Sequence, residues 1–290
     1  MQAAFLFDCD GVLYHGQRGE PGAAEALHAL QAAGKRVLFV TNSASRHRSV
    51  MAGKLRGLGM PDDVKSCYTS ARAAARYLQQ RGVRRAFVVG TAGLAQELGE
   101  AGIEALGGGD FAVLDAETGD LPTSEQAHDS ELEEDVGAVV VGYDARFTYG
   151  KLAHASALLR ADARCALVGT NGDACATAAN GRLCPAAGAI LAAVEVGSGR
   201  KATIVGKPEQ TFLRGILEDN GLDPSTTVMV GDRLDTDMKF GNDGGLKTLL
   251  VLSGVTEENA EVPTGMEPTL VAGSVAELAA AARAAALLPN

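Results

Sequence analysis

The chain has 290 residues, of which 46% are hydrophobic, and its formal net charge is −10. This length suggests one large or two ordinary domains. The negative charge disfavours nucleic acid as a partner, because binding to a phosphate backbone requires basic patches.

Cysteine usage and hydropathy indicate the compartment. The five cysteines form an odd number without a CxxC pair or zinc-ligand spacing, so we expect free thiols in a reducing cytosol. Asp8 interrupts the N-terminal apolar run before a signal-peptide core could form. The apolar tract at 274–288 contains Glu277 and Arg283 and is too short to span a bilayer. We therefore expect a cytoplasmic protein without a membrane role.

Short apolar runs alternate with helical patterns along the whole chain. Strands are predicted at 3–7, 36–42, 85–90, 138–144, 165–171, 201–206, 226–232 and 247–254. Helices are predicted at 21–34, 46–58, 70–82, 92–102, 148–161, 209–220 and 235–243. The Gly-rich and acidic stretch at 107–135 is predicted to be a solvated loop. Apolar strands that alternate with helices are typical of a parallel sheet covered on both faces, an α/β fold.

The middle of the chain has its own succession of strands and helices. We therefore predict one α/β domain interrupted by another. The outer domain comprises residues 1–80 and 187–290, and the inserted domain comprises residues 81–186.

The segment DCDGVLY at 8–14 follows the first apolar strand and begins with Asp8, Asp10 and Gly11. Because open α/β sheets place their chemistry at strand ends, where the chain can bend, both carboxylates can approach one point. Such a pair suits Mg²⁺, or a nucleophile with an acid/base beside it. Taken alone, the segment is better explained as a polar turn, because Asp and Gly are common turn residues.

Three further strand ends carry polar groups, and each has a purely structural explanation. Thr41-Asn42-Ser43 could cap a helix, Lys207 could be a surface cation, and GDRLDTD at 231–237 could begin a helix. The ends of parallel strands share one edge, however, where carboxylates would repel one another and raise each other's pKa. A divalent cation resolves that conflict, leaving Thr41 and Lys207 to bind an anion. The set predicts a Mg²⁺-dependent phosphate site.

These motifs together resemble a known family. DCDGVLY, VTNS, VGKP and GDRLDTD resemble, in order, the four signature motifs of haloacid dehalogenase (HAD)-like phosphatases. The inserted segments VVVGYDARFTYGKL and GTNGDACATAANGRLCPAAGAI resemble the cap of the NagD, 4-nitrophenylphosphatase and phosphoglycolate/pyridoxal phosphatase group. The resemblance covers nearly the whole chain. It implies a Rossmann-like doubly wound parallel sheet with an inserted α/β C2-type cap.

The resemblance also implies roles for individual residues. Asp8 would attack phosphorus to form an aspartyl-phosphate, and Asp10 would protonate the leaving alcohol and then activate water. Asp8, the main-chain carbonyl of Asp10 and Asp232 would hold Mg²⁺. Thr41 and Lys207 would bind the phosphoryl oxygens. Asn42 would lie beside them, and Asp237 would be a supporting acid for a metal-bound water or Lys207. Independently of the resemblance, turn amides near Gly11 and Asn42 are expected to add donors.

Two departures from the group bear on the substrate rather than on the reaction. Motif two reads TNSAS, so Ser43 replaces an amide side chain. The cap segment beginning at Asp173 lacks the bulky aromatic or imidazole group of some relatives. Asp173 is our candidate for contacting substrate, and a turn residue after Gly172 is an equally good explanation of it. The substrate is expected to be a small phosphate monoester. Caps of this group often mediate dimerisation, so the resemblance also implies a homodimer formed through the cap.

Other functions remain open at this point. Dehalogenases of the same family lack the second acid, so Asp10 favours a phosphatase. A phosphomutase would return the phosphoryl group to its product instead of releasing free phosphate. A phosphoaspartate receiver domain also combines acids, a hydroxyl and a lysine, although the early DxD and the inserted domain argue against it. A dinucleotide-binding fold is disfavoured because no GxGxxG follows the first strand.

Overall fold

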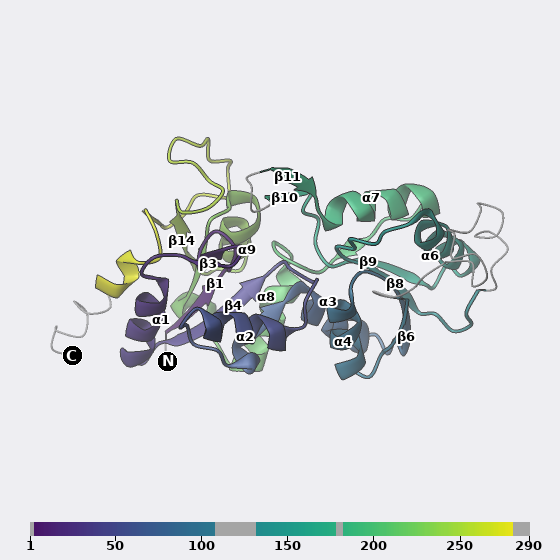
Figure 1. Cartoon of the computed structure of the whole chain (residues 1–290), viewed down its shortest axis with the longest axis horizontal. Coiled ribbons are helices and arrows are strands. Elements are labelled where there is room, and N and C mark those ends of the chain that lie inside the picture. The colour runs from purple at the N-terminus through teal and green to yellow at the C-terminus, as the bar shows by residue number, and fades with distance from the viewer. Residues whose placement is uncertain (1–2, 108–131, 178–181, 281–290) are drawn as a thin grey trace. The chain divides into compact units, whose positions relative to one another are not determined.

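The computed structural model describes residues 3–107, 132–177 and 182–280 (Figure 1). Internal contacts divide the chain into two compact units. The first unit comprises residues 1–41, 48–68 and 207–290, and the second comprises residues 42–47 and 69–206. Each unit contains a parallel sheet with helices, so the predicted α/β class is confirmed.

The first unit is built on a six-stranded sheet in the order β15-β14-β13-β1-β4-β5. All of its pairings that involve β1, β13 and β14 are parallel. The strands are β1 (Ala4–Phe7), β4 (Arg36–Thr41), β5 (Cys67–Thr69), β13 (Thr227–Gly231), β14 (Lys247–Val251) and β15 (Leu270–Ala272). The central position of β1 is what places residue 8 at the middle of one sheet edge.

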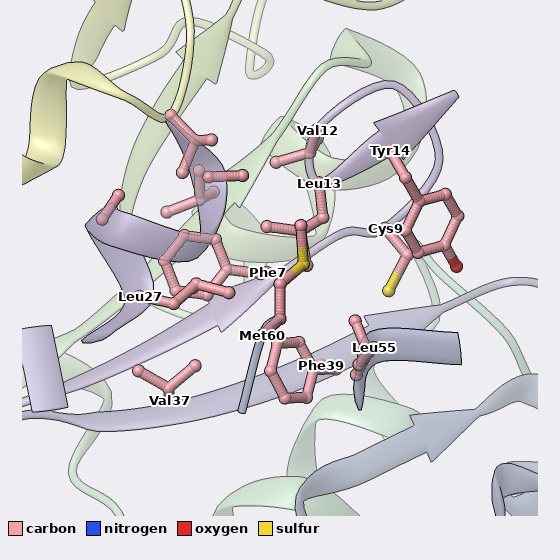
Figure 2. Close-up of a cluster of buried hydrophobic side chains, with 14 of the residues drawn as sticks. Phe7, Cys9, Val12, Leu13, Tyr14, Leu27, Val37, Phe39, Leu55 and Met60 are labelled. Carbon is pink, nitrogen blue, oxygen red and sulfur yellow. The ribbon is translucent and has the colours of Figure 1, made fainter. Parts of the chain in front are cut away.

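Helices cover both faces of this sheet. Phe7 and Phe39 point to the face covered by α1 (Ala23–Ala32) and α2 (Arg48–Gly57), where they pack with Leu27 and Leu55 (Figure 2). Successive side chains along a strand point to opposite faces of the sheet, so the residues next to Phe7 and Phe39 point to the second face. That second face is covered by α8 (Gln210–Asn220) and α9 (Lys239–Asp243), where Gly241 approaches Met229. Each buried large apolar side chain contributes about 1.5–3 kcal/mol to this packing.

The second unit is built on a five-stranded parallel sheet in the order β12-β9-β8-β6-β7. Its strands are β6 (Arg85–Val89), β7 (Glu104–Gly107), β8 (Ala138–Val141), β9 (Ala166–Gly169) and β12 (Thr203–Ile204). Its helices are α3 (Ser70–Gln79), α4 (Ala92–Glu100), α6 (Tyr149–Ala161) and α7 (Ala187–Ser198). In Figure 1, α6 and α7 lie together on one side of this sheet and α3 and α4 on the other.

The strand before Lys207 was predicted to belong to the first domain, and that prediction is wrong. β12 pairs with β9 in the second sheet, through Thr203 and Ile204 alone. So short a strand carries too little apolar pattern to indicate which sheet it joins. The units also divide elsewhere than at 80 and 186, because α3 and α7 make their contacts in the second unit.

Several short elements complete the description. Antiparallel hairpins join β2 (Tyr14–His15) to β3 (Arg18–Gly19) and β10 (Cys175–Thr177) to β11 (Leu183–Pro185). Short 3₁₀ turns occur at η1 (Val64–Ser66) and η2 (Pro224–Thr226). The predicted helix at 235–243 begins as a π-helical turn, η3 (Leu234–Met238), before it continues as α9.

Some sequence predictions fall outside the described residues. Most of the predicted acidic loop, residues 108–131, and most of the apolar tract at 274–288, residues 281–288, are among them. Within the residues that the structure does describe, no helix has both the length and the apolar character that crossing a membrane requires.

Candidate active site

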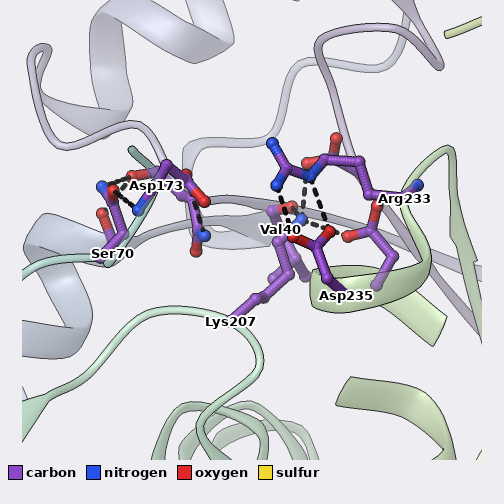
Figure 3. A network of polar contacts seen from close by, with 10 residues as sticks. Val40, Ser70, Asp173, Lys207, Arg233 and Asp235 are labelled. Atoms are coloured by element: carbon purple, nitrogen blue, oxygen red, sulfur yellow. Dashed lines mark hydrogen bonds and ion pairs between the residues drawn. The ribbon is translucent and has the colours of Figure 1, made fainter. Parts of the chain in front are cut away.

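A buried ammonium group lies at the carboxyl edge of the first unit's sheet. Lys207 Nζ donates to Asp8 Oδ1 at 2.6 Å, to Asp237 Oδ1 at 2.7 Å and to the Val40 carbonyl at 3.0 Å. The Lys207 side chain is only 2% exposed. Figure 3 shows Lys207 beneath Val40, beside the turn that carries Arg233 and Asp235. With three acceptors for its three protons, the ammonium is fully satisfied and therefore held in one position.

Separate elements deliver these partners. Asp8 directly follows β1, and its amide donates to the Val230 carbonyl of β13 at 2.8 Å. Asp237 lies in the π-helical turn η3 and accepts from the Arg233 amide at 3.2 Å. Gly231 is required beneath it, because a Cβ there would lie 2.2 Å from the Asp237 Cβ. The wider π-turn and the small residue thus allow Asp237 to turn back towards the strand ends.

Asp232 is a third buried carboxylate of this edge, and it is closely confined. Its Oδ2 accepts from the Val255 amide at 2.8 Å. A Cβ on Gly11 or on Gly254 would come within 2.3 Å or 1.9 Å of that oxygen. The Oδ1 atom is buried and has no hydrogen-bond partner among the described residues. A buried acceptor of this kind carries a desolvation cost that a bound ligand would remove.

Burial and mutual repulsion change how these acids titrate. Burial raises the pKa of Asp8, although Lys207 opposes the rise. Burial, together with the charges of Asp8 and Asp237, raises the pKa of Asp232 to about 8. Burial also raises the pKa of Asp237 to about 6, again against the influence of Lys207. Burial alone would lower the pKa of Lys207, but Asp237 and Asp8 raise it above its ordinary value.

The three carboxylates fit a divalent cation. Asp8, Asp232 and Asp237 each offer one oxygen, and these atoms lie within 4.8 Å of one another. Carboxylate oxygens are hard ligands of the kind that Mg²⁺ takes. A cation among them would favour their charged forms and reverse the rise in pKa. The clearest sign that the donor set suits such an ion is Asp232 Oδ1, which has no hydrogen-bond partner among the residues that the structure describes.

The other predicted positions of the first unit lie at the same strand ends. Thr41 is buried and is the last residue of β4, directly after Val40. Asp10 is exposed, and its backbone pairs with Tyr14 across the turn. Gly11, at φ 85°, adopts a conformation that residues with a Cβ rarely tolerate. The turn therefore presents the side chain of Asp10 outward while Asp8 stays buried.

The remaining predicted substrate residues belong to the second unit. Asn42 Nδ2 donates to Asp173 Oδ2 at 3.3 Å, so these two predicted residues are brought together. Ser43 is exposed, and its hydroxyl lies 3.2 Å from that of Ser45. Figure 3 labels Asp173, with Ser70 close to it.

Sequence reasoning missed Asn171 and Ser70, which both bind the Asn42 carbonyl. Asn171 Nδ2 donates to it at 2.8 Å and the Ser70 hydroxyl at 2.5 Å. Asn171 also accepts from the Asp173 amide at 3.1 Å. A signal was present, because Thr170-Asn171 repeats the Thr41-Asn42 pair after another strand. The Val40 carbonyl and the Val255 amide were missed too, and main-chain groups leave no such signal.

The segment that follows Thr41 is anchored within the second unit. The Thr91 hydroxyl donates to the Ser45 carbonyl at 2.6 Å. His47 Nε2 lies 2.9 Å from Glu100 Oε1 and 3.6 Å from Glu97 Oε1. These contacts fasten residues 42–47 to α4.

Comparison with known proteins identifies the family. A haloacid dehalogenase-like hydrolase family matches residues 5–104, and a HAD-hydrolase-like family matches residues 204–278. Glycerol-3-phosphate phosphatase of Rattus norvegicus is 40% identical over 94% of this chain and 88% of its own. The chain belongs to the haloacid dehalogenase-like hydrolases. The resemblance inferred from the four motifs is thereby confirmed.

Solved structures of phosphatases superpose on nearly the whole of this chain. The 4-nitrophenylphosphatase of Thermotoga maritima superposes with a TM-score of 0.79 at 31% identity, over 97% of each chain. A glycerol phosphate phosphatase from Mycobacterium tuberculosis, in complex with magnesium, superposes with a TM-score of 0.78 at 27% identity. That match covers 96% of this chain and 76% of the other.

The raised pKa of Asp232 leads to a stability prediction for the metal-free hydrolase. Its folded-state value of about 8 exceeds the ordinary 3.8, so the ionised carboxylate destabilises the fold increasingly as pH rises between these values. We expect Asp232→Asn to raise the melting temperature in chelator-treated buffer, by about 2–4 °C per kcal/mol regained. Thermal unfolding should show a larger gain at pH 8 than at pH 5. An equal or smaller gain at pH 8 would contradict the assignment of buried charge.

Proposed function

We propose that this hydrolase is a Mg²⁺-dependent phosphatase of small phosphate monoesters that works through an aspartyl-phosphate at Asp8. The observation that carries the proposal is the buried Lys207 ammonium, bound to Asp8 and Asp237 beside Asp232 Oδ1, for which the described part of the chain supplies no hydrogen-bond partner. A cationic group and a cation-binding carboxylate set next to one strand-end aspartate suit a nucleophile that attacks an anionic substrate.

In the first step an oxygen of Asp8 attacks phosphorus. The bond from phosphorus to the ester oxygen breaks, and Asp10, in its acid form, protonates the departing alcohol. Asp8 must be ionised to attack, and Lys207 favours that form by opposing the rise in the Asp8 pKa. The exposed position of Asp10, two residues from the buried nucleophile, supports a role as the group that meets the leaving alcohol.

In the second step water attacks the phosphorus of the aspartyl-phosphate. Asp10, now a carboxylate, takes a proton from that water, and the bond between phosphorus and Asp8 breaks. Inorganic phosphate leaves and both aspartates return to their starting forms. Transfer to water rather than back to an alcohol is what separates this phosphatase from a phosphomutase.

Asp8, the Asp10 main-chain carbonyl and Asp232 are the groups proposed to hold Mg²⁺, with Asp237 supporting Lys207. When bound, Mg²⁺ neutralises carboxylate charge and polarises the phosphoryl oxygens. Thr41 and Lys207 are proposed to bind the phosphoryl group, with turn amides near Gly11 as further donors.

The second unit is proposed to act as the cap that selects the leaving group. Asn42, Ser43 and Asp173 are the candidate substrate contacts, and the bond from Asn42 to Asp173 supports treating two of them as one group. We propose that the first unit is the catalytic core and that the second unit is the cap, with α7 and β12 in the cap rather than in the core.

Partners and compartment complete the proposal. Five free cysteines, of which Cys175 and Cys184 are exposed, fit a cytoplasmic protein. The net charge of −10 argues against nucleic acid, and no membrane role is proposed. We further propose a homodimer formed through the cap. Light scattering on the purified protein should give twice the chain mass of 29.8 kDa, and a single-chain mass would contradict the dimer.

Removal of the nucleophile tests the mechanism. We expect Asp8→Asn to reduce hydrolysis of 4-nitrophenyl phosphate by about 10⁴-fold or more, because an amide cannot form the phosphoenzyme. Release of free phosphate is the measurement. Asp62→Asn, at a partly exposed carboxylate paired with Arg56, serves as the matched control and should keep the parental rate. Near-normal turnover by Asp8→Asn would refute the covalent mechanism.

Removal of the metal tests the cofactor. Dialysis against EDTA should stop turnover, and Mg²⁺ should restore it. Without substrate, Mg²⁺ at 100 times its Kd should stabilise the folded protein by about 2.7 kcal/mol. Thermal unfolding measures this gain, which should be largely lost in Asp232→Asn. Full activity after exhaustive chelation would rule out a required metal.

A further inference from the structure

A short segment after β14 contacts two catalytic strand ends at once. The Ser253 hydroxyl donates to the Gly11 carbonyl at 2.8 Å. The Val255 amide donates to Asp232 Oδ2 at 2.8 Å, and the Thr256 amide to the Asp232 carbonyl at 3.1 Å. We call residues 253–256 the strap. It joins the turn that follows Asp10 to the carboxylate that follows β13.

Close packing leaves the strap little freedom. A Cβ on Gly254 would lie 1.9 Å from Asp232 Oδ2, and a Cβ on Gly11 would lie 3.2 Å from the Gly254 Cα. The backbones of Gly11 and Gly254 therefore meet around one carboxylate oxygen. Displacement of either backbone would move the Asp232 carboxylate or break its bond to Val255.

The two oxygens of Asp232 are thereby made unequal. Oδ2 is occupied by a main-chain amide, while Oδ1 is buried and without a hydrogen-bond partner among the described residues. An amide that binds one oxygen orients the other, as surrounding groups orient carboxylate ligands at metal sites. The strap thus determines which oxygen is left for a cation.

Of the strap's three bonds to the two strand ends, only the bond from Ser253 comes from a side chain. It holds the Gly11 carbonyl, one residue after Asp10, from a position 242 residues further along the chain. The Ser253 hydroxyl therefore holds the main chain of Gly11, which directly follows Asp10. Loss of the hydroxyl would release both the Asp10 turn and the strap that orients Asp232.

We propose that Ser253 is a positioning residue, whose hydroxyl ties the Asp10 turn to the strap and so orients Asp232 for a divalent cation. This inference rests on the proposed function. Ser253 contacts neither substrate nor cation in this scheme, and it acts through Gly11 and through the Val255 amide. Its effect should therefore appear in cation affinity and in kcat more than in the KM for substrate.

The test compares Ser253→Ala, Ser253→Thr and Ser253→Val, of which Thr and Val have nearly the same shape and differ in the hydroxyl. Ser225→Ala removes an exposed hydroxyl that donates to Asp223 within its own turn, and it serves as the control. Calorimetry gives the Kd for Mg²⁺ without substrate. Steady-state hydrolysis of 4-nitrophenyl phosphate at saturating Mg²⁺ gives kcat and KM, and thermal unfolding reports folding.

We expect Ser253→Ala and Ser253→Val to weaken Mg²⁺ binding about tenfold, a factor in the range of one lost hydrogen bond. The kcat should fall by a similar factor while KM changes less than about threefold. Ser253→Thr should stay within about threefold of the parent in both the Kd for Mg²⁺ and kcat. Ser225→Ala should match the parent in both quantities. If Ser253→Ala unfolds, the comparison between Thr and Val carries the test.

Parental Mg²⁺ affinity and kcat in Ser253→Ala would overturn the proposal. So would equal losses in Thr and Val, since they would indicate a requirement for shape rather than for a hydroxyl. If the parent binds Mg²⁺ in a Ser253-dependent way but does not hydrolyse the ester, the proposed function fails and the positioning role stands. If the parent hydrolyses the ester and the Ser253 variants do so at the parental rate with parental Mg²⁺ affinity, the positioning role fails and the proposed function stands.

Discussion

The site depends on one buried ion-paired group, the ammonium of Lys207. It satisfies Asp8, Asp237 and the Val40 carbonyl together, so it joins two carboxylates that would otherwise repel one another. Removal of one partner from such a buried set costs about 3–5 kcal/mol, because the remaining charge is left uncompensated. The arrangement is therefore rigid, and Asp8, Lys207 and Asp237 are fixed relative to one another.

Asp232, unlike Lys207, is a buried group whose hydrogen bonds are incomplete among the described residues. Its Oδ1 is buried without a hydrogen-bond partner among the described residues, and its raised pKa reflects burial close to Asp8 and Asp237. A structure selected for stability alone would not keep such a group, whereas binding sites commonly do. The glycines at 11 and 254 allow the backbone to close around the carboxylate. The same feature that weakens the unliganded fold suits the cation that we propose for this site.

The convergence of Asp8, Lys207 and Asp232 could be predicted because each follows an apolar strand. The parallel pairing of β1 with β4 and with β13 brings the ends of these three strands to one edge of the sheet, as predicted. Lys207 also lies at that edge, where it binds Asp8. The strand before it, β12, does not belong to that sheet but pairs with β9 in the other one. Lys207 reaches Asp8 from the chain that returns out of the second unit. The roles assigned to these residues remain predictions.

The sequence by itself determined the α/β class, the family and the acids and lysine of the site, because hydrophobic periodicity and ordered motifs are local properties of a chain. Only the tertiary structure decided which groups surround them. The Val40 carbonyl, the Val255 amide and the bond from Ser253 to Gly11 join positions between 23 and 242 residues apart. Main-chain donors and acceptors are the same in every residue except proline, so their selection depends on how the strands pack and leaves no mark in the sequence.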